Sequence, residues 1–300
     1  MKLTSALLGL TVSLPLFAGC SALDSDASGS RPHVVTGIYP YAYVAARIAG
    51  DHATITNLTT PGVEPHDLEL TPRQVADISE ADVVVYESGF QPSVDSAVDQ
   101  SAAGATLDVT DVVPLKDTSA PTEQDDLSGD PHIWQDPTLL IPIVEAVTSD
   151  ISEADPAHED DYRSNAAGLV SDLKDLDRDF ANGLADCERT TFVTSHAAFG
   201  YLASRYDLEM IPIAGLSPEV EPSPQHLAEM ADYIETDGIT TVFSETLGTK
   251  AYADTLARDL GVQSAVLDPV EGLADDDSDD DYLSLMRENL AALQQANGCS

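Results

Sequence analysis

One long proline-free segment, Glu159 to Leu184, divides this chain into two halves. Its apolar residues recur mostly three or four positions apart, which predicts an amphipathic helix. On either side of it, short apolar runs alternate with helical stretches. Because this alternation is typical of parallel sheets covered by helices, we predict an α/β protein with two lobes joined by one long backbone helix. The apolar residues of the helix are Leu169, Leu173, Leu176, Phe180 and Leu184.

The predicted organisation assigns residues 33–157 to an N-terminal α/β lobe, 158–185 to the linking helix and 186–300 to a C-terminal α/β lobe. The stretch 116–130 is rich in Asp, Ser and Thr without periodicity, and is therefore predicted to be a loop. Strands are expected at 33–38, 53–58, 81–86, 190–194, 210–213, 240–243 and 264–267. Helices are expected at 40–49, 71–80, from 136 towards 149, and at 197–206, 225–236, 250–260 and 281–295.

The N-terminus carries the features of an export signal. Residues 1–19 combine a lysine, an apolar stretch and small residues directly before Cys20, which is typical of a lipoprotein signal peptide with Cys20 as the lipidated residue. Phe17 stands where that pattern usually has Leu, and an ordinary secretory signal is the alternative. Residues 20–32, rich in Ser, Asp and Gly, are predicted to be a flexible tether. We therefore expect an extracytoplasmic protein anchored to the cell membrane by its N-terminal lipid.

Two further cysteines, Cys187 and Cys299, would remain after lipidation of Cys20. An even number of cysteines in an oxidising compartment favours one disulfide between them. Unpaired thiols or zinc ligands are the alternatives.

The charge of the chain restricts its partners. With 53 acidic and 13 basic residues among 300, the net charge is −40, which argues against nucleic acid and against a basic membrane-binding patch. An acidic surface favours cations in general, without selecting one of them. We interpret most of these carboxylates as a solvated surface.

Four motifs far apart in the chain each end in a side chain that can bind a transition metal. Three imidazoles and one carboxylate form a complete tetrahedral ligand set for Zn²⁺. Because α/β sheets bind ligands at the carboxyl ends of their strands, ligands directly after predicted strands fit this site. Glu64 is a possible alternative or additional carboxylate. The predicted ligands are His66, His132, His196 and Asp268, whereas His33, His52, His158 and His226 are expected to have no metal role.

These motifs, in this order, resemble the metal-binding solute-binding proteins of zinc and manganese ABC importers, a family that includes proteins once called adhesins. The resemblance rests on VVTGIYPYAYVAARIAGD, PGVEPHDLELTPRQVADISEADVVVYESG, DPHIWQDP, TFVTSHAAFGYLASRYDL, SPEVEPSPQHLAEM, VFSETL and VLDPVEGL. It implies two α/β lobes with the metal in the cleft between them. It also implies His66, His132, His196 and Asp268 as ligands, and Trp134 is expected to pack beside His132.

Within that family the third ligand is typically His in zinc-type members and Glu in manganese-type ones, so His196 implies zinc, with manganese as the alternative. The loop 116–130 is acidic but lacks the histidines of many zinc-type members, which argues against auxiliary zinc collection there. The resemblance implies a monomer that delivers zinc to an ABC importer permease served by separate ATPase subunits. Unperturbed imidazoles have a pKa near 6.5, so zinc affinity is expected to fall below about pH 6.

Catalysis is not expected. The chain shows no GxGxxG, GxxxxGK[ST] or GxSxG motif, so neither nucleotide hydrolysis nor a serine nucleophile is indicated. Three histidines around zinc also occur in hydrolases with an open coordination position, but a fourth carboxylate would fill that position. A secreted zinc hydrolase and a surface adhesin with structural zinc are the alternatives from other classes.

Overall fold

The computed structural model describes residues 31–118, 129–248, 250–275 and 279–300. Residues 31–300 form one compact unit. The predicted signal peptide, the lipidated Cys20, most of the tether and most of the 116–130 loop lie outside the described residues. Among the described helices, none combines the length and apolar character needed to cross a membrane.

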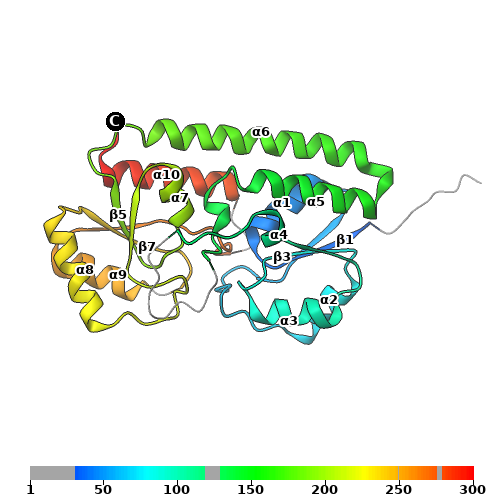
Figure 1. Ribbon diagram of the computed structural model, residues 1–300, viewed down its shortest axis with the longest axis horizontal. Helices are drawn as coiled ribbons and strands as arrows, with labels where there is room; N and C mark the ends of the chain where they lie inside the picture. The colour runs from blue at the N-terminus through cyan, green and yellow to red at the C-terminus, as the bar shows by residue number, and fades with distance from the viewer. Residues whose placement is uncertain (1–30, 119–128, 249, 276–278) are drawn as a thin grey trace, which may run out of the picture. The chain divides into compact units, whose positions relative to one another are not determined.

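The N-terminal lobe is built on a parallel sheet with strand order β2-β1-β3-β4 (Figure 1). Central strands β1 and β3 are short runs of buried valine, as expected for strands covered on both faces. The strands are β1 His33–Thr36, β2 Thr54–Asn57, β3 Val83–Tyr86 and β4 Ala105–Asp108. The helices are α1 Tyr39–Ala49, α2 Pro72–Glu80, α3 Pro92–Ser101, α4 Val109–Val112 and α5 Leu140–Ala154, with short 3-10 turns η1 Ile133–Gln135 and η2 Pro156–His158.

The C-terminal lobe repeats this arrangement, with a parallel sheet of strand order β6-β5-β7-β8 (Figure 1). The two sheets therefore have the same topology, and the predicted class of two α/β lobes is confirmed. The strands are β5 Thr191–Thr194, β6 Glu209–Pro212, β7 Thr241–Ser244 and β8 Gln263–Val266. The helices are α7 Gly200–Arg205, α8 Pro224–Thr236, α9 Ala251–Leu260 and α10 Tyr282–Asn297.

Alternate residues of the central strands point to opposite faces of each sheet, following the two-residue period of a strand. One face of each sheet packs into a core shared by both lobes, and the other packs into a smaller core of its own lobe. The shared core takes Val34, Val83, Val85, Phe192 and Phe243. The smaller cores take Val35 and Val84 in the N-terminal lobe, and Val193 and Val242 in the C-terminal lobe.

Helix α6, Glu159–Gly183, coincides with the predicted linking helix. It packs against α1 and α5 of the N-terminal lobe and against α10 of the C-terminal lobe (Figure 1). Three acidic residues in its first turn interact favourably with the helix dipole. A buried stripe along α6 therefore contributes to the core of both lobes. Its members are Tyr162, Ala166, Leu169, Leu173, Leu176 and Phe180.

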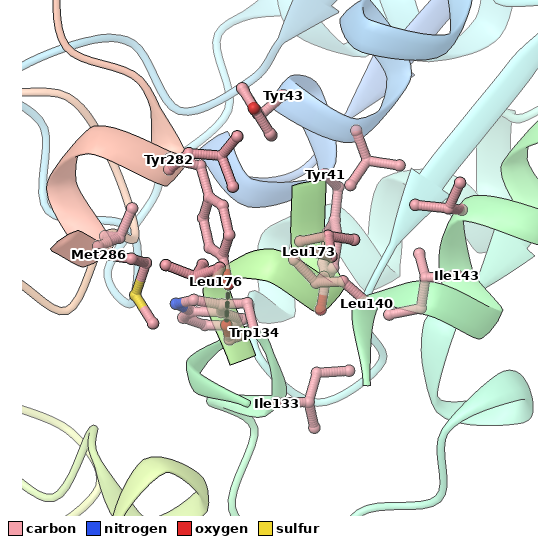
Figure 2. Packing of buried hydrophobic residues seen from close by; sticks show 14 of the residues in the cluster. Tyr41, Tyr43, Ile133, Trp134, Leu140, Ile143, Leu173, Leu176, Tyr282 and Met286 are labelled. Atoms are coloured by element: carbon pink, nitrogen blue, oxygen red, sulfur yellow. Dashed lines mark hydrogen bonds between the residues drawn. The ribbon is translucent and has the colours of Figure 1, made fainter. Parts of the chain in front are cut away.

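Trp134 is fully buried where the two lobes meet (Figure 2). Its indole Nε1 donates to the carbonyl of Pro269 at 2.8 Å, and its own carbonyl accepts from the Tyr282 hydroxyl at 2.6 Å. Its ring lies edge-on to the His132 ring, with centroids 5.4 Å apart. The expected packing of Trp134 beside His132 is thus confirmed, and it connects the His132 loop to the C-terminal lobe.

The N-terminal lobe differs from the sequence prediction at helices α3, α4 and α5 and at strand β4. Helix α3 and strand β4 were not predicted, because α3 has few apolar residues and β4 is an edge strand without an apolar run. Helix α5 begins at Leu140 and not at Asp136. The Asp136 carboxylate accepts from the backbone N–H and hydroxyl of Thr138, at 2.9 and 2.7 Å, and so forms a turn before the helix.

Candidate metal centre

Three histidines and one glutamate converge in the shared interior of the two lobes. His66, His132, His196 and Glu271 each offer one ligand atom, and these atoms all lie within 4.8 Å of one another. The Nε2 atoms of His66, His132 and His196 lie 3.6, 3.1 and 3.4 Å from Glu271 Oε1. All four side chains are buried, and none of the four atoms has a hydrogen bond of acceptable geometry to the described residues.

Such an arrangement is unfavourable for a protein interior unless something occupies its centre. Buried polar atoms are normally hydrogen-bonded, and leaving them without a partner costs about 1–3 kcal/mol each. Three imidazole nitrogens and one carboxylate oxygen form the donor set of a tetrahedral zinc site. The group is therefore a candidate metal centre for a borderline-soft divalent ion.

His66 lies on the loop between β2 and α2, and neighbouring residues hold this loop in place. Glu64 Oε2 accepts from the backbone N–H of His66 at 3.0 Å and of Asp67 at 3.3 Å. Gln91 Nε2 donates to the Pro65 carbonyl at 3.0 Å. The His66 ring packs edge-on against Phe90, with centroids 4.5 Å apart. These contacts hold the first imidazole at the carboxyl edge of the N-terminal sheet.

His132 lies directly before η1 and is fully buried. Asp130 Oδ1 lies 2.9 Å from the backbone nitrogen of His132 and 2.7 Å from its ring Nδ1. Asp130 also pairs with Lys116 in an antiparallel bridge, and its Oδ2 accepts from the Thr118 hydroxyl. The base of the acidic loop is thus connected through Asp130 to the second imidazole.

His196 follows β5 by two residues, as expected for a ligand at the carboxyl end of a parallel strand. Glu245 Oε1 lies 3.1 Å from the backbone nitrogen of His196 and 2.6 Å from its ring Nδ1. Glu245 comes directly after β7, which pairs with β5. Two adjacent strands therefore end in a histidine and in the carboxylate that holds it.

The carboxylate in this group is Glu271, and the placement of Asp268 in it requires correction. Asp268 Oδ1 accepts from the backbone N–H of Val270 at 2.7 Å, so this side chain holds the turn after β8. The backbone of Asp268 is in turn tied to Asn289, at 2.8 and 2.6 Å. Sequence reasoning selected the first carboxylate after the strand, although Glu271 lies in the same VLDPVEGL motif.

Val270 gives this turn its shape. Its φ is 57°, in the left-handed region that a β-branched residue rarely adopts. The side chain of Val270 is fully buried in the shared core, and this burial holds the unfavourable backbone conformation in place. The turn directs the Glu271 side chain towards the three histidines. The backbone carbonyl of Glu271 accepts from the Tyr39 N–H at 3.3 Å.

Glu64, the possible alternative carboxylate, is not part of the group of four. Its Oε2 is used by the backbone of the His66 loop, and its Oε1 is buried without a partner among the described residues. Burial, followed by repulsion from Glu271, raises the pKa of Glu64 to about 8. The carboxylate that faces the three histidines is therefore Glu271, while Glu64 serves the backbone of the His66 loop.

Burial and neighbouring charges shift the pKa of all four members of the group in the metal-free protein. Burial lowers the pKa of His66. Burial also opposes protonation of His132, but Asp130 and Glu271 outweigh it and raise the pKa of His132 to about 9. Burial likewise opposes protonation of His196, yet Glu245 and Glu271 hold its pKa well above the ordinary value. Burial would raise the pKa of Glu271, but the three histidines hold it well below its usual range.

The remaining histidines lie elsewhere and have other contacts. His33 Nε2 contacts the Thr56 hydroxyl at 2.9 Å, and His226 Nε2 lies 3.3 Å from the Pro212 carbonyl. His52 and His158 stack on each other, with ring centroids 4.0 Å apart. None of them belongs to the group of four.

Cys187 and Cys299 form a disulfide in the structure. It connects the segment after α6 to the end of the chain, next to backbone hydrogen bonds from Arg189 to Asn297 and from Ser300 to Asp186. The bridge belongs entirely to the C-terminal lobe and does not touch the candidate metal centre.

The fold and the buried three-histidine, one-glutamate group define a metal-binding solute-binding protein of the two-lobed α/β class. The family model described as zinc-uptake complex component A, periplasmic, matches residues 34–296. This chain belongs to that family.

Relatives and solved structures agree with this assignment. The high-affinity zinc uptake system protein ZnuA of Bacillus subtilis is 32% identical over 286 residues, covering 91% of this chain and 89% of that protein. The zinc-binding lipoprotein AdcA of Streptococcus pneumoniae is 34% identical over 98% of this chain, which spans only 61% of AdcA. The crystal structure of the Zn(II)-bound ZnuA-like domain of that AdcA superposes with a TM-score of 0.74 at 33% identity, covering 89% of this chain and 99% of that domain.

Proposed function

We propose that this protein captures Zn²⁺ outside the cytoplasm and delivers it to the permease of an ABC importer. One observation carries the proposal: three imidazole Nε2 atoms and Glu271 Oε1 converge in a buried space, without other partners among the described residues. The assignment to a zinc-uptake family supports the same cargo. Zinc is the transported substrate here, and the protein itself carries out no chemical reaction.

The donor set favours zinc over manganese. Three nitrogens and one oxygen suit Zn²⁺, whereas Mn²⁺ prefers more oxygen ligands. His196 is the third of these ligands and is fully buried. Replacement of His196 by Glu is therefore expected to move the relative affinity towards Mn²⁺.

The delivery step rests on the family and on the N-terminal sequence. Cys20 is proposed as the lipid attachment site that keeps the protein at the membrane surface, near its permease and the ATPase subunits. We propose that the protein acts as a monomer, with His66, His132, His196 and Glu271 as the complete ligand set. The net charge of −40 supports a cation as cargo.

A competitive titration with Zn²⁺ and Mn²⁺, combined with metal analysis of the purified chain, tests this function. One tightly bound zinc per chain is expected, lost in His66→Ala and His132→Ala while the fold stays intact. Preference for Mn²⁺ would keep the carrier role but change the cargo. Unfolding on zinc removal would indicate a structural zinc site, as in the adhesin alternative, because a carrier must stay folded and reload.

A further inference from the structure

His132 and His196 come from different parts of the chain but are held by the same arrangement of atoms. In each case one carboxylate oxygen faces both the backbone nitrogen and the ring Nδ1 of the same histidine. For Asp130 Oδ1 these distances are 2.9 and 2.7 Å, and for Glu245 Oε1 they are 3.1 and 2.6 Å. The ring of each histidine is thereby fixed relative to its own backbone.

The chemistry of a buried carboxylate determines which ring nitrogen carries the proton. Asp130 is 1% exposed and Glu245 4% exposed, so water does not replace the histidines as donors. A carboxylate oxygen only accepts, so the lone pair of an Nδ1 without a hydrogen would repel it at these distances. Each Nδ1 must therefore carry a hydrogen, which leaves Nε2, on the other side of the ring, as the metal-binding nitrogen.

Both carboxylates are themselves fixed by the surrounding structure. Glu245 is placed by β7, which pairs with β5 beside His196. Asp130 accepts from the Thr118 hydroxyl and lies against Gly200 at the start of α7. A Cβ at Gly200 would come within 2.7 Å of Asp130 Oδ2 and 1.8 Å of Thr118 Oγ1, so only glycine leaves room for this contact.

His66 is held differently. The carboxylate next to it, Glu64, accepts from two backbone N–H groups of the loop, those of His66 and Asp67. The His66 ring is instead supported by Phe90, an apolar contact that does not select a ring nitrogen. The paired arrangement is thus specific to two of the three imidazoles.

We propose that Asp130 and Glu245 are positioning residues that set zinc affinity by fixing the orientation and the Nδ1–H tautomer of His132 and His196. The proposal rests on the proposed zinc-binding function. Neither carboxylate is within the group of four that would touch the metal. Their contribution is to keep two Nε2 atoms directed at one point before zinc arrives.

Alanine and amide variants separate positioning from general stability. Asp130→Ala and Glu245→Ala are each expected to weaken zinc binding about 10- to 100-fold, the usual effect of removing a carboxylate behind a ligand histidine. Asp130→Asn and Glu245→Gln keep an oxygen that accepts the same hydrogens, and are expected to recover most of the lost affinity. Asp136→Asn is the matched control, since this buried acid bonds to Thr138 and to no histidine.

A second measurement uses the unmodified protein and does not depend on the alanine variants folding. Nitrogen-15 NMR of the imidazole rings in the zinc-loaded chain is expected to show a proton on Nδ1 of both His132 and His196, with zinc on Nε2. A ring without a proton on Nδ1 at either position would overturn the proposal. Unchanged zinc affinity in the folded alanine variants would also overturn it, while tight binding by the wild type would leave the proposed function intact. Failure of the wild type to bind zinc would instead refute the function.

Discussion

The two lobes place a buried glutamate at the same point of the same topology, yet the two glutamates have different partners. Glu87 comes directly after β3 and Glu245 directly after β7, and each is 4% exposed. Glu245 contacts the backbone and ring of His196, whereas the Glu87 carboxylate accepts from the hydroxyl of Tyr41. Strand order thus determines where a carboxylate is buried, and the facing side chain determines its chemistry.

The different partner of Glu87 affects its protonation. Burial raises its pKa to about 8, because the phenol of Tyr41 stabilises the charge less than burial destabilises it. Glu87 is therefore largely protonated at neutral pH. The C-terminal lobe uses its glutamate next to the candidate metal centre, while the N-terminal lobe keeps its glutamate as a neutral part of the core.

The largest expected difference between the lobes concerns stability. Only the C-terminal lobe is cross-linked, by a disulfide that joins residues 112 positions apart. The Cys187→Ser, Cys299→Ser double variant is expected to lose about 4–5 kcal/mol by the chain-entropy argument. Hydrogen exchange should locate this loss in β5 to β8. An equal loss in β1 to β4 would show that the lobes unfold as one cooperative unit and would remove this contrast.

The next largest effect separates the two carboxylates after β8. Glu271→Gln is expected to weaken zinc binding more than about 100-fold, because a ligand should contribute more than the residues behind it. Asp268→Asn is the matched control and should change zinc affinity only a few-fold, since its Oδ1 accepts from Val270 and does not face the histidines. Isothermal titration of both variants decides between them, and the reverse ranking would restore Asp268 as the ligand.

Zinc affinity is expected to depend on pH over a higher range than unperturbed imidazoles would give. Carboxylates raise the pKa of His132 to about 9 and that of His196 well above normal, so zinc must displace protons at neutral pH. Each displaced proton lowers the affinity about tenfold per pH unit below that pKa. Titrations between pH 6 and 9.5 test this expectation, and constant affinity from pH 7 to 9 would contradict it.

The stability of the metal-free protein should show the opposite trend. A raised histidine pKa stabilises the fold below the unfolded value of 6.5, and this contribution is lost as the pH rises through about 9. The unfolding temperature of the metal-free protein is therefore expected to fall as the pH rises from 6.5 to about 9. The zinc-loaded protein should show no such decline, because its histidines are already deprotonated.

The smallest effect on zinc binding is expected for Glu87→Gln. The variant keeps the contact with Tyr41, so zinc affinity should stay within about threefold and stability at acid pH should change by about 1 kcal/mol. Because the wild-type pKa is raised from 4.5 to about 8, wild-type stability declines across that range and glutamine avoids the decline. Urea unfolding at several pH values measures the difference in unfolding free energy between the variant and the wild type, which is expected to grow as the pH rises. A large loss of zinc affinity would place Glu87 in the metal centre and end the contrast with Glu245.

The sequence predicted much of this structure because its strongest signals are local. Buried valine runs identify β1 and β3, and the apolar spacing of α6 identifies the linking helix. Three of the four converging residues, the histidines, were predicted because the short motifs around them occur together and in the order that the family resemblance implies. Strand β4 and helix α3 were missed, since an exposed edge strand and a polar helix carry little periodicity.

The positions of Glu271 and of the supporting carboxylates depend on contacts that no local pattern reveals. Asp268 and Glu271 stand three positions apart, and only the turn at Val270 decides which of them faces the histidines. Glu245 is distant from His196 in the chain and meets it because β7 pairs with β5. Asp130, two residues before His132, was the one supporting group whose position offered a sequence signal.

Because the turn at Val270 positions Glu271, metal affinity should depend on how tightly the Val270 side chain is packed. Its left-handed backbone is held by burial of the Val270 side chain in the shared core. A substitution that loosens this packing would let the turn relax and carry Glu271 away from its place, while most of the core stays intact. Zinc retention should therefore fail earlier than the fold when the protein is heated or when this region accumulates mutations.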